Sequence, residues 1–170
     1  FTYYESKDGT MVPLTYFHRK DVELNSQTPV FLYGYGGYNI SIRPSFSRKY
    51  VGWLELGGVV AIANLRGGGE LGKKWHNAGR LKEKQNVFDD FLYASKYLEA
   101  EGVGNRKSTV ISGRSNGGLL VGTSLVQNPN YFGATLPAVG VLDMLRFTEF
   151  TEGWGWRGDY GSPLLSKEDF

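Results

Sequence analysis

Cysteine is absent from the 170 residues, which excludes disulfides, thiolate metal sites and a cysteine nucleophile. A chain without cysteine tolerates oxidising and reducing compartments alike, so a cytoplasmic and a periplasmic location both stay open. Long apolar runs are absent as well, since none approaches the roughly 20 residues of a membrane-spanning helix. Neither sign of charge dominates, since the net charge is +2. So small a net charge gives no electrostatic reason to bind nucleic acid or a membrane.

The composition is that of a soluble globular protein, with 41% hydrophobic and 21% charged residues. A chain of 170 residues is long enough for one domain with its own core. The first residues, FTYY, fit neither a signal peptide nor an initiator methionine, and the last residues carry no closing signal. We therefore expect residues 1–170 to be one partial domain of a longer protein.

Residues 110–120 (VISGRSNGGLL) hold the most informative pattern of the chain. A β-branched run leads into Gly-x-Ser-x-Gly, and small and aliphatic residues follow at helical spacing. This order predicts a nucleophile elbow, a strand–turn–helix unit with Ser115 at its apex. Gly113 and Gly117 must be small, because a Cβ at either position would collide with the neighbouring turn. An ordinary Gly/Ser turn is the alternative, and the flanking strand and helix disfavour it.

Strands and helices are expected to alternate around this elbow. An Asp-Gly turn between β-rich runs at 1–5 and 11–19 predicts a hairpin. Further strands are expected at 30–33, 59–63, 108–112 and 133–139, and helices at 44–56, at 86–101 with Asn86 as the cap, and from the elbow to Asn128. This alternation predicts an α/β-hydrolase fold, with a doubly wound and mostly parallel sheet that is truncated at its C-terminal side.

A glycine-rich segment, residues 64–70 (NLRGGGE), follows the strand expected at 59–63. It lacks the Gly-Lys-Ser/Thr ending of a phosphate-binding loop. We interpret it as a turn that places Arg66 and Glu70 beside a site. The adjacent Asp89 and Asp90 invite a catalytic interpretation, but neighbouring residues diverge on a helix. A role at the start of the helix is therefore the better prediction for both carboxylates.

Several segments in a fixed order resemble the prolyl oligopeptidase family: residues 31–42 (FLYGYGGYNISI), 64–70 (NLRGGGE), 84–90 (KQNVFDD) and 113–118 (GRSNGG), followed by DYG at 159–161. Together they are far more specific than the elbow alone. The resemblance implies a serine endopeptidase that cuts short peptides after proline and uses no cofactor. It also implies a monomer in which a β-propeller domain of the same protein restricts access to the site.

The same resemblance assigns the groups that carry the chemistry. Ser115 resembles the nucleophile of the family, and Tyr35 resembles the hydroxyl donor of its oxyanion hole. The backbone N–H of Asn116 is the second donor, at a helix N-terminus where a developing negative charge is stabilised. A packing role is the alternative for Tyr35 in a chain with 11 tyrosines. Its place between glycines directly after a strand disfavours that alternative.

The resemblance also implies a pocket for the substrate proline. Trp156 is expected to stack on the proline ring, and Tyr38 and Val141 are expected to line the same pocket. An aromatic face and aliphatic walls suit a flat, apolar ring without an N–H. Trp154 is the nearby alternative, and the alignment around DYG favours Trp156.

A serine triad also needs a histidine and a carboxylate, and hydrolases of this fold place both after the serine. The two histidines here, His18 and His76, precede Ser115, so we expect them to be structural or exposed. Asp143 follows a strand beyond the elbow, but a role in a turn near the pocket is the better prediction. The triad Asp and His are therefore expected beyond residue 170, and this chain by itself is expected to be inactive.

Two alternatives stay open beside cleavage after proline. Family members that cut after basic residues share the arginine found at Arg114, whereas Asn116, Trp156 and residues 38–39 favour proline. A hydrolase-fold module that binds without catalysis would also keep the elbow. A lipase or esterase fits the elbow but not the aromatic segments around it.

Overall fold

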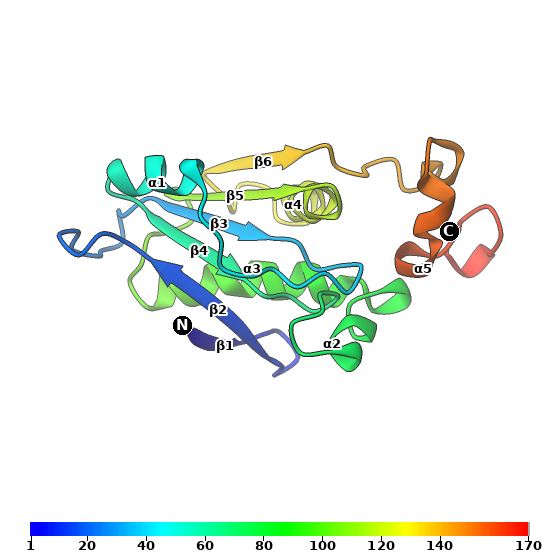
Figure 1. Cartoon of the computed structure of the whole chain (residues 1–170), viewed down its shortest axis with the longest axis horizontal. Helices are drawn as coiled ribbons and strands as arrows, with labels where there is room; N and C mark the ends of the chain where they lie inside the picture. The colour runs from blue at the N-terminus through cyan, green and yellow to red at the C-terminus, as the bar shows by residue number, and fades with distance from the viewer. Residues whose placement is uncertain (170) are drawn as a thin grey trace.

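The computed structural model describes residues 1–169 and contains one six-stranded sheet (Figure 1). The strands are β1 (Thr2–Glu5), β2 (Met11–Phe17), β3 (Val30–Gly34), β4 (Val59–Ala63), β5 (Thr109–Arg114) and β6 (Ala134–Ala138), in the order β1-β2-β4-β3-β5-β6. The last four are parallel to one another, and β1 and β2 run antiparallel at one edge. The predicted hairpin and the predicted strands are thus confirmed.

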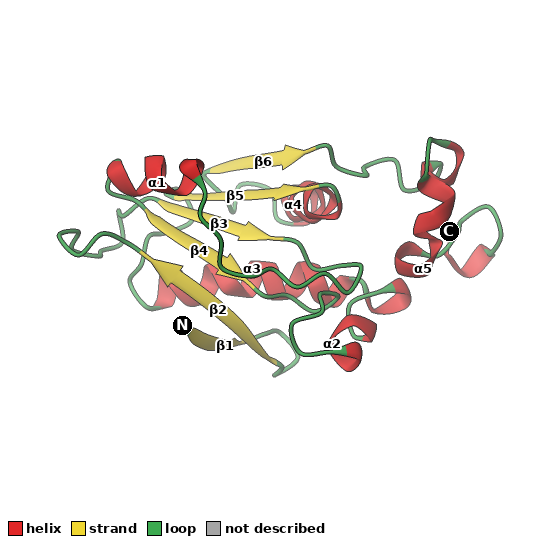
Figure 2. Cartoon of the chain, viewed as in Figure 1, coloured by secondary structure: helices red, strands yellow, loops and turns green. Residues whose placement is uncertain are grey.

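Helices cover both faces of the sheet (Figure 2). Helix α1 (Arg48–Glu55) packs on one face, and α3 (Gln85–Ala100) and α4 (Asn116–Gln127) pack on the other. All five residues of β4 are buried, and they alternate between the two cores, with Ala61 facing α3 and Val60 facing α1. A sheet covered on both sides requires such an uninterrupted apolar strand, so the doubly wound arrangement is confirmed.

Shorter elements gather beyond the carboxyl ends of the parallel strands (Figure 1). They include α2 (Lys73–Asn77), α5 (Arg157–Tyr160) and 3₁₀ turns at Leu81–Glu83, Phe147–Glu149, Gly153–Trp156 and Lys167–Asp169. No helix within residues 1–169 is long and apolar enough to cross a membrane.

The helix expected at 44–56 begins only at Arg48, after the N-cap Ser47. The residues before it are held by groups from elsewhere in the chain, since Ile42 donates its N–H to Glu70 and accepts from the Asn64 amide. The backbone before Pro44 also disfavours the helical region. Asn86 is likewise not the cap, because the helix begins at Gln85 and the Asn86 amide donates to the Ala78 carbonyl.

The expectation that Arg66 lies beside the site is wrong. Its guanidinium is 4% exposed and donates to Asp90 over 2.6 Å and to Asp8, away from the elbow. The expectation of a helix-start role is wrong for both Asp89 and Asp90, because α3 begins at Gln85 and its first turn holds no acidic residue. Asp90 is fully buried and is the partner of Arg66. Asp89 diverges to the surface and pairs with Lys7. A buried guanidinium needs such partners, and this requirement sets the direction of the side chain.

Candidate active site

Ser115 stands at the turn between β5 and α4, with φ 59° and ψ −117°. Its N–H donates to the Ala138 carbonyl of β6 over 2.9 Å, and its own carbonyl accepts from Gly118 over 2.8 Å. A Cβ on Gly113 would overlap the backbone of Gly117, and one on Gly117 would lie 2.8 Å from the Gly34 carbonyl oxygen. The backbone therefore has the strained geometry that a nucleophile elbow requires.

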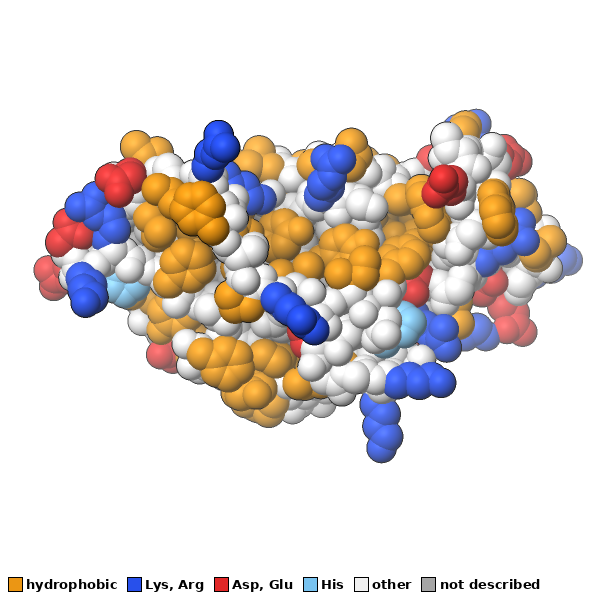
Figure 3. Space-filling model, viewed as in Figure 1, with side chains coloured by type: hydrophobic (Ala, Val, Ile, Leu, Met, Phe, Trp, Pro, Cys, Tyr) orange, Lys and Arg blue, Asp and Glu red, His pale blue; other side chains and the backbone are white. Residues whose placement is uncertain are grey.

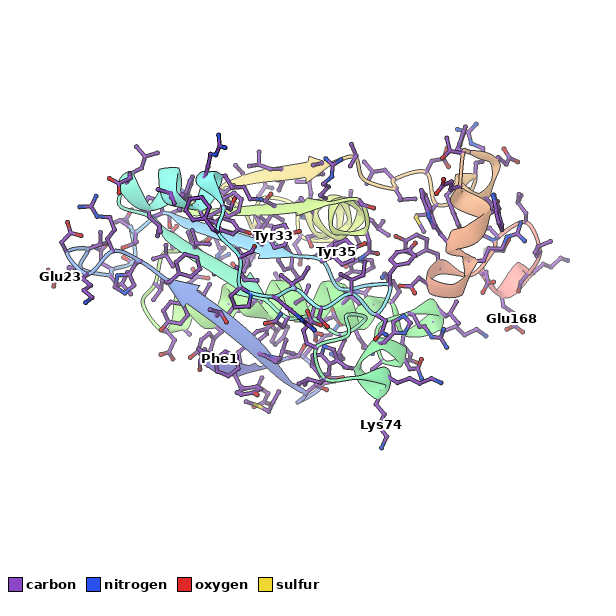
Figure 4. The ribbon with its side chains drawn as sticks, viewed as in Figure 1. Phe1, Glu23, Tyr33, Tyr35, Lys74 and Glu168 are labelled. Atoms are coloured by element: carbon purple, nitrogen blue, oxygen red, sulfur yellow. The ribbon has the colours of Figure 1, made fainter. Side chains whose placement is uncertain are left out.

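The loop after β3 carries Tyr35 to this elbow (Figure 4). Burial raises the pKa of the Tyr35 phenol, and the nearby Ser115 hydroxyl acts on that pKa in the opposite direction. Gly36 adopts φ +64°, and a Cβ on Gly37 would meet the Asn116 amide at 2.5 Å. The glycines after β3 are thus required for the loop to approach the elbow this closely.

Asn116 follows the serine and begins α4, so its backbone N–H has no acceptor within the helix. The residue is 1% exposed, and its side chain is fully engaged. The amide nitrogen donates to the Tyr35 carbonyl over 2.6 Å, while Oδ1 accepts from the Tyr160 hydroxyl over 2.9 Å and from Lys84 Nζ over 3.1 Å. The side chain thereby joins the Tyr35 loop to the first turn of the helix.

A second group of polar side chains lies behind Asn116, and the sequence analysis assigned no role to it. Asp159 is 4% exposed and accepts from the Tyr38 N–H over 2.8 Å and from His76 Nε2 over 3.0 Å. Lys84 Nζ lies 3.9 Å from the same carboxylate. The only sequence signal for this group was the presence of Lys84 and Asp159 inside segments 84–90 and 159–161.

A cavity of about 240 Å³ lies next to the first turn of α4, since Gly140 of its lining packs against Gly118. Two of the three residues expected in the proline pocket line it. Val141 and Trp156 share this cavity with two phenylalanines, Phe147 and Phe150. Figure 3 shows apolar side chains gathered between the strand ends and the C-terminal turns. Trp154, the alternative to Trp156, is 65% exposed and outside the lining.

Tyr38 stands outside the lining of this cavity. Its ring meets Tyr160 edge-on at 5.6 Å between centroids, and Tyr160 meets Phe147 edge-on at 5.5 Å. Two packed rings, Tyr160 and Phe147, therefore separate Tyr38 from the cavity. Asp143 lies at the cavity and accepts from the backbone N–H and the guanidinium of Arg146, as expected of a carboxylate that supports a turn.

Neither histidine is positioned as a general base. His76 lies in α2 and its Nε2 is hydrogen-bonded to Asp159, while His18 Nδ1 contacts the Arg19 carbonyl. Within residues 1–169, no imidazole nitrogen is hydrogen-bonded to Ser115. Over the same residues, no cluster of three His, Asp or Glu side chains could hold a metal ion.

Comparisons with known proteins agree with this geometry. A prolyl endopeptidase of Elizabethkingia meningoseptica is 48% identical over 168 residues, which are 99% of this chain and 24% of that protein. A prolyl endopeptidase of Dictyostelium discoideum is 46% identical over 162 residues, which are 94% of this chain and 21% of that protein. The chain thus spans about a quarter of the length of these relatives.

Solved structures agree as well. A prolyl endopeptidase structure has a TM-score of 0.96 at 49% identity over 99% of this chain and 25% of its own length. A post-proline cleaving enzyme from Rickettsia typhi has a TM-score of 0.95 at 36% identity, over 99% of this chain and 24% of its own. The sequence pattern of the prolyl oligopeptidase family matches residues 44–170. This chain belongs to the prolyl oligopeptidase family.

Proposed function

We propose that the protein containing this chain is a serine peptidase that cleaves short peptides on the carboxyl side of proline. The observation that carries the proposal is the convergence at the elbow. Ser115 holds a strained backbone, the Tyr35 loop is tied to Asn116 with its phenol near Ser115, and the Asn116 N–H begins the following helix. Family membership and the names of the relatives support the same reaction.

The reaction is acyl transfer in two steps. The Ser115 oxygen attacks the carbonyl carbon of the substrate proline while a general base takes its proton, and the Tyr35 hydroxyl and the Asn116 N–H hold the charge on the carbonyl oxygen. Collapse breaks the C–N bond, and the base returns the proton to the leaving amine. Water then releases the acyl group from Ser115 by the same route. We place the base and its orienting carboxylate in the part of the longer protein outside this chain.

The substrate proline would bind in the cavity lined by Val141 and Trp156. Its lining is mostly apolar, so a ring without an N–H can be buried there with no polar group left unpaired. Tyr38 would act at the edge of this pocket, through Tyr160. A β-propeller elsewhere in the protein would restrict entry to short peptides.

The test is hydrolysis of matched peptide anilides by the full-length protein, with proline, arginine or alanine before the scissile bond. We expect a preference for proline, labelling of Ser115 by a fluorophosphonate, and loss of both activities in Ser115→Ala. A preference for arginine would instead place the protein among the members that cut after basic residues. Absence of both cleavage and labelling would identify a binding module.

A further inference from the structure

Lys84 places a charged group where little water reaches it. The side chain precedes α3 and is 13% exposed, and burial lowers its pKa to about 8 from the ordinary value of 10.5. The nearby Asp159 carboxylate acts in the opposite direction. Burying an ammonium group is unfavourable, so the protein keeps it here only because strong acceptors surround it.

The acceptors come from the two elements that carry the oxyanion donors. Lys84 Nζ donates to the Gly36 carbonyl over 3.1 Å and to Asn116 Oδ1 over 3.1 Å. The first belongs to the Tyr35 loop, and the second belongs to the first turn of α4. One ammonium group therefore bridges the loop and the helix directly behind Ser115.

We propose that Lys84 is a positioning residue for the oxyanion hole. Its ammonium group clamps the Tyr35 loop to the start of α4, so that the Tyr35 hydroxyl and the Asn116 N–H face one point above Ser115. This inference rests on the proposed function. Lys84 itself touches neither the substrate nor the reacting atoms.

Two successive carbonyls of the loop are held in this way. The Tyr35 carbonyl accepts from the Asn116 amide over 2.6 Å, and the Gly36 carbonyl accepts from Lys84. Gly37 leaves no free space between loop and helix, since a Cβ there would meet the Asn116 amide. Loss of the Lys84 donor would free the Gly36 carbonyl and one lone pair of Asn116, and the loop could then shift. A misplacement of about 1 Å at a catalytic group costs on the order of 100-fold in rate.

The test is steady-state kinetics of the full-length protein with a proline anilide. We expect Lys84→Met to lower kcat by about 10- to 100-fold with KM changed less than about threefold, because the lost interaction acts in the transition state. Lys82→Met is the matched control, since this exposed lysine two residues away pairs with Glu168 at the surface. Its kinetics should equal those of the wild type.

A double-mutant cycle with Tyr35→Phe separates positioning from general stability. If Lys84 acts through the Tyr35 hydroxyl, Lys84→Met should lower kcat by less than about threefold in the Tyr35→Phe background. If Lys84→Met lowered kcat equally in the wild-type and Tyr35→Phe backgrounds, the proposal would be overturned. An unchanged kcat in a folded Lys84→Met protein would also overturn it.

Asn116→Ala is the second variant if Lys84→Met does not fold. It removes the side-chain acceptor of Lys84 and the amide that donates to the Tyr35 carbonyl, but it keeps the backbone N–H. We expect a loss of kcat at least as large as in Lys84→Met, and an unchanged kcat would overturn the proposal. Failure of the proposed function is distinguishable, because the wild type itself would then cleave no proline anilide.

Discussion

The Tyr35 phenol must stay protonated to donate to an oxyanion, and its surroundings favour that state. Burial raises the pKa of Tyr35, while the nearby Ser115 hydroxyl acts in the opposite direction and is the smaller effect. The backbone carbonyl of the same residue is held by the Asn116 amide. The backbone of Tyr35 is thus fixed by the elbow that it serves, which contributes to the preorganisation that electrostatic catalysis requires.

Trp156 allows a test of proline recognition at a single residue. The indole lines the cavity beside the elbow, so Trp156→Ala should lower kcat/KM for proline anilides by about 10- to 100-fold through lost apolar contact. For alanine anilides, whose smaller side chain makes less contact with the indole, kcat/KM should fall by less than about threefold. Trp154→Ala is the matched control, because that indole is largely exposed and outside the cavity. Equal loss for both substrates would contradict stacking on proline.

The site residues differ in how far the sequence could identify them. Ser115 and Asn116 stand in a local Gly-x-Ser-x-Gly pattern that predicts their place at the elbow, whereas the role of Tyr35 is a prediction implied by the family resemblance. The group behind them could not be found that way, because His76 and Asp159 meet across 83 residues of chain. Lys84 and Asn116 meet across 32. Such pairs depend on how the loops fold back over the strand ends, and no period in the sequence encodes this.

At the scale of elements, glycine is sterically required in the elbow but not in helix α1. A Cβ on Gly113 would overlap the backbone of Gly117, whereas one on Gly52 in α1 would meet nothing within 4 Å. We expect Gly113→Ala to lower the free energy of unfolding by about 1–3 kcal/mol through overpacking. Gly52→Ala should raise it by about 0.4–1 kcal/mol, because it restricts the unfolded chain. Equilibrium denaturation of both variants measures the two changes in the free energy of unfolding. Changes of the same sign would contradict this account.

The bounds of an element could be predicted where the local sequence pattern and the burial agree. They were less predictable where groups distant in the sequence hold the backbone. Strand β4 has the predicted bounds because five consecutive apolar residues can be buried only between two layers. Helix α1 starts later than predicted, after the N-cap Ser47, which is extended. The segment that leads to Pro44 is held by a hydrogen bond from the Ile42 N–H to Glu70, 28 residues away, which no local pattern indicates.

At the scale of the whole molecule, a buried ionic cluster joins the hairpin to the rest of the fold. Arg66 follows β4 and donates to Asp90 of α3 over 2.6 Å and 2.9 Å. It also donates to Asp8 in the turn between β1 and β2, and Ser6 of the same turn donates to Asp90 over 2.5 Å. The Tyr4 hydroxyl donates to the Asp90 backbone carbonyl. The antiparallel edge of the sheet is therefore tied to the α3 layer by polar contacts as well as by packing.

Removal of Arg66 should be costly, since Arg66→Met leaves Asp90 buried without its partner. We expect the free energy of unfolding to fall by about 3–5 kcal/mol at neutral pH, as for other broken buried pairs. Lys7→Met is the control, because the Lys7–Asp89 pair is partly exposed and should cost less than about 1 kcal/mol. Equilibrium denaturation of the two variants against the wild type measures the difference.

The cost of Arg66→Met should also depend on pH, with a definite sign. The hydrogen bond from Arg66 lowers the pKa of Asp8 to about 2 from 3.8, so it stabilises the fold above pH 3.8 and is lost as pH falls towards 2. Asp8 is half-exposed, so solvent weakens this contribution. Burial raises the pKa of Asp90 above its ordinary value even beside Arg66, and loss of the guanidinium raises it further, so Asp90 of the variant takes up its proton at a higher pH than Asp8 does. The gap in unfolding free energy between wild type and Arg66→Met therefore narrows first through Asp90 and then through Asp8, as pH falls from neutral to about 2. A gap that stays constant over this range would show that the cluster holds the hairpin by packing rather than by charge.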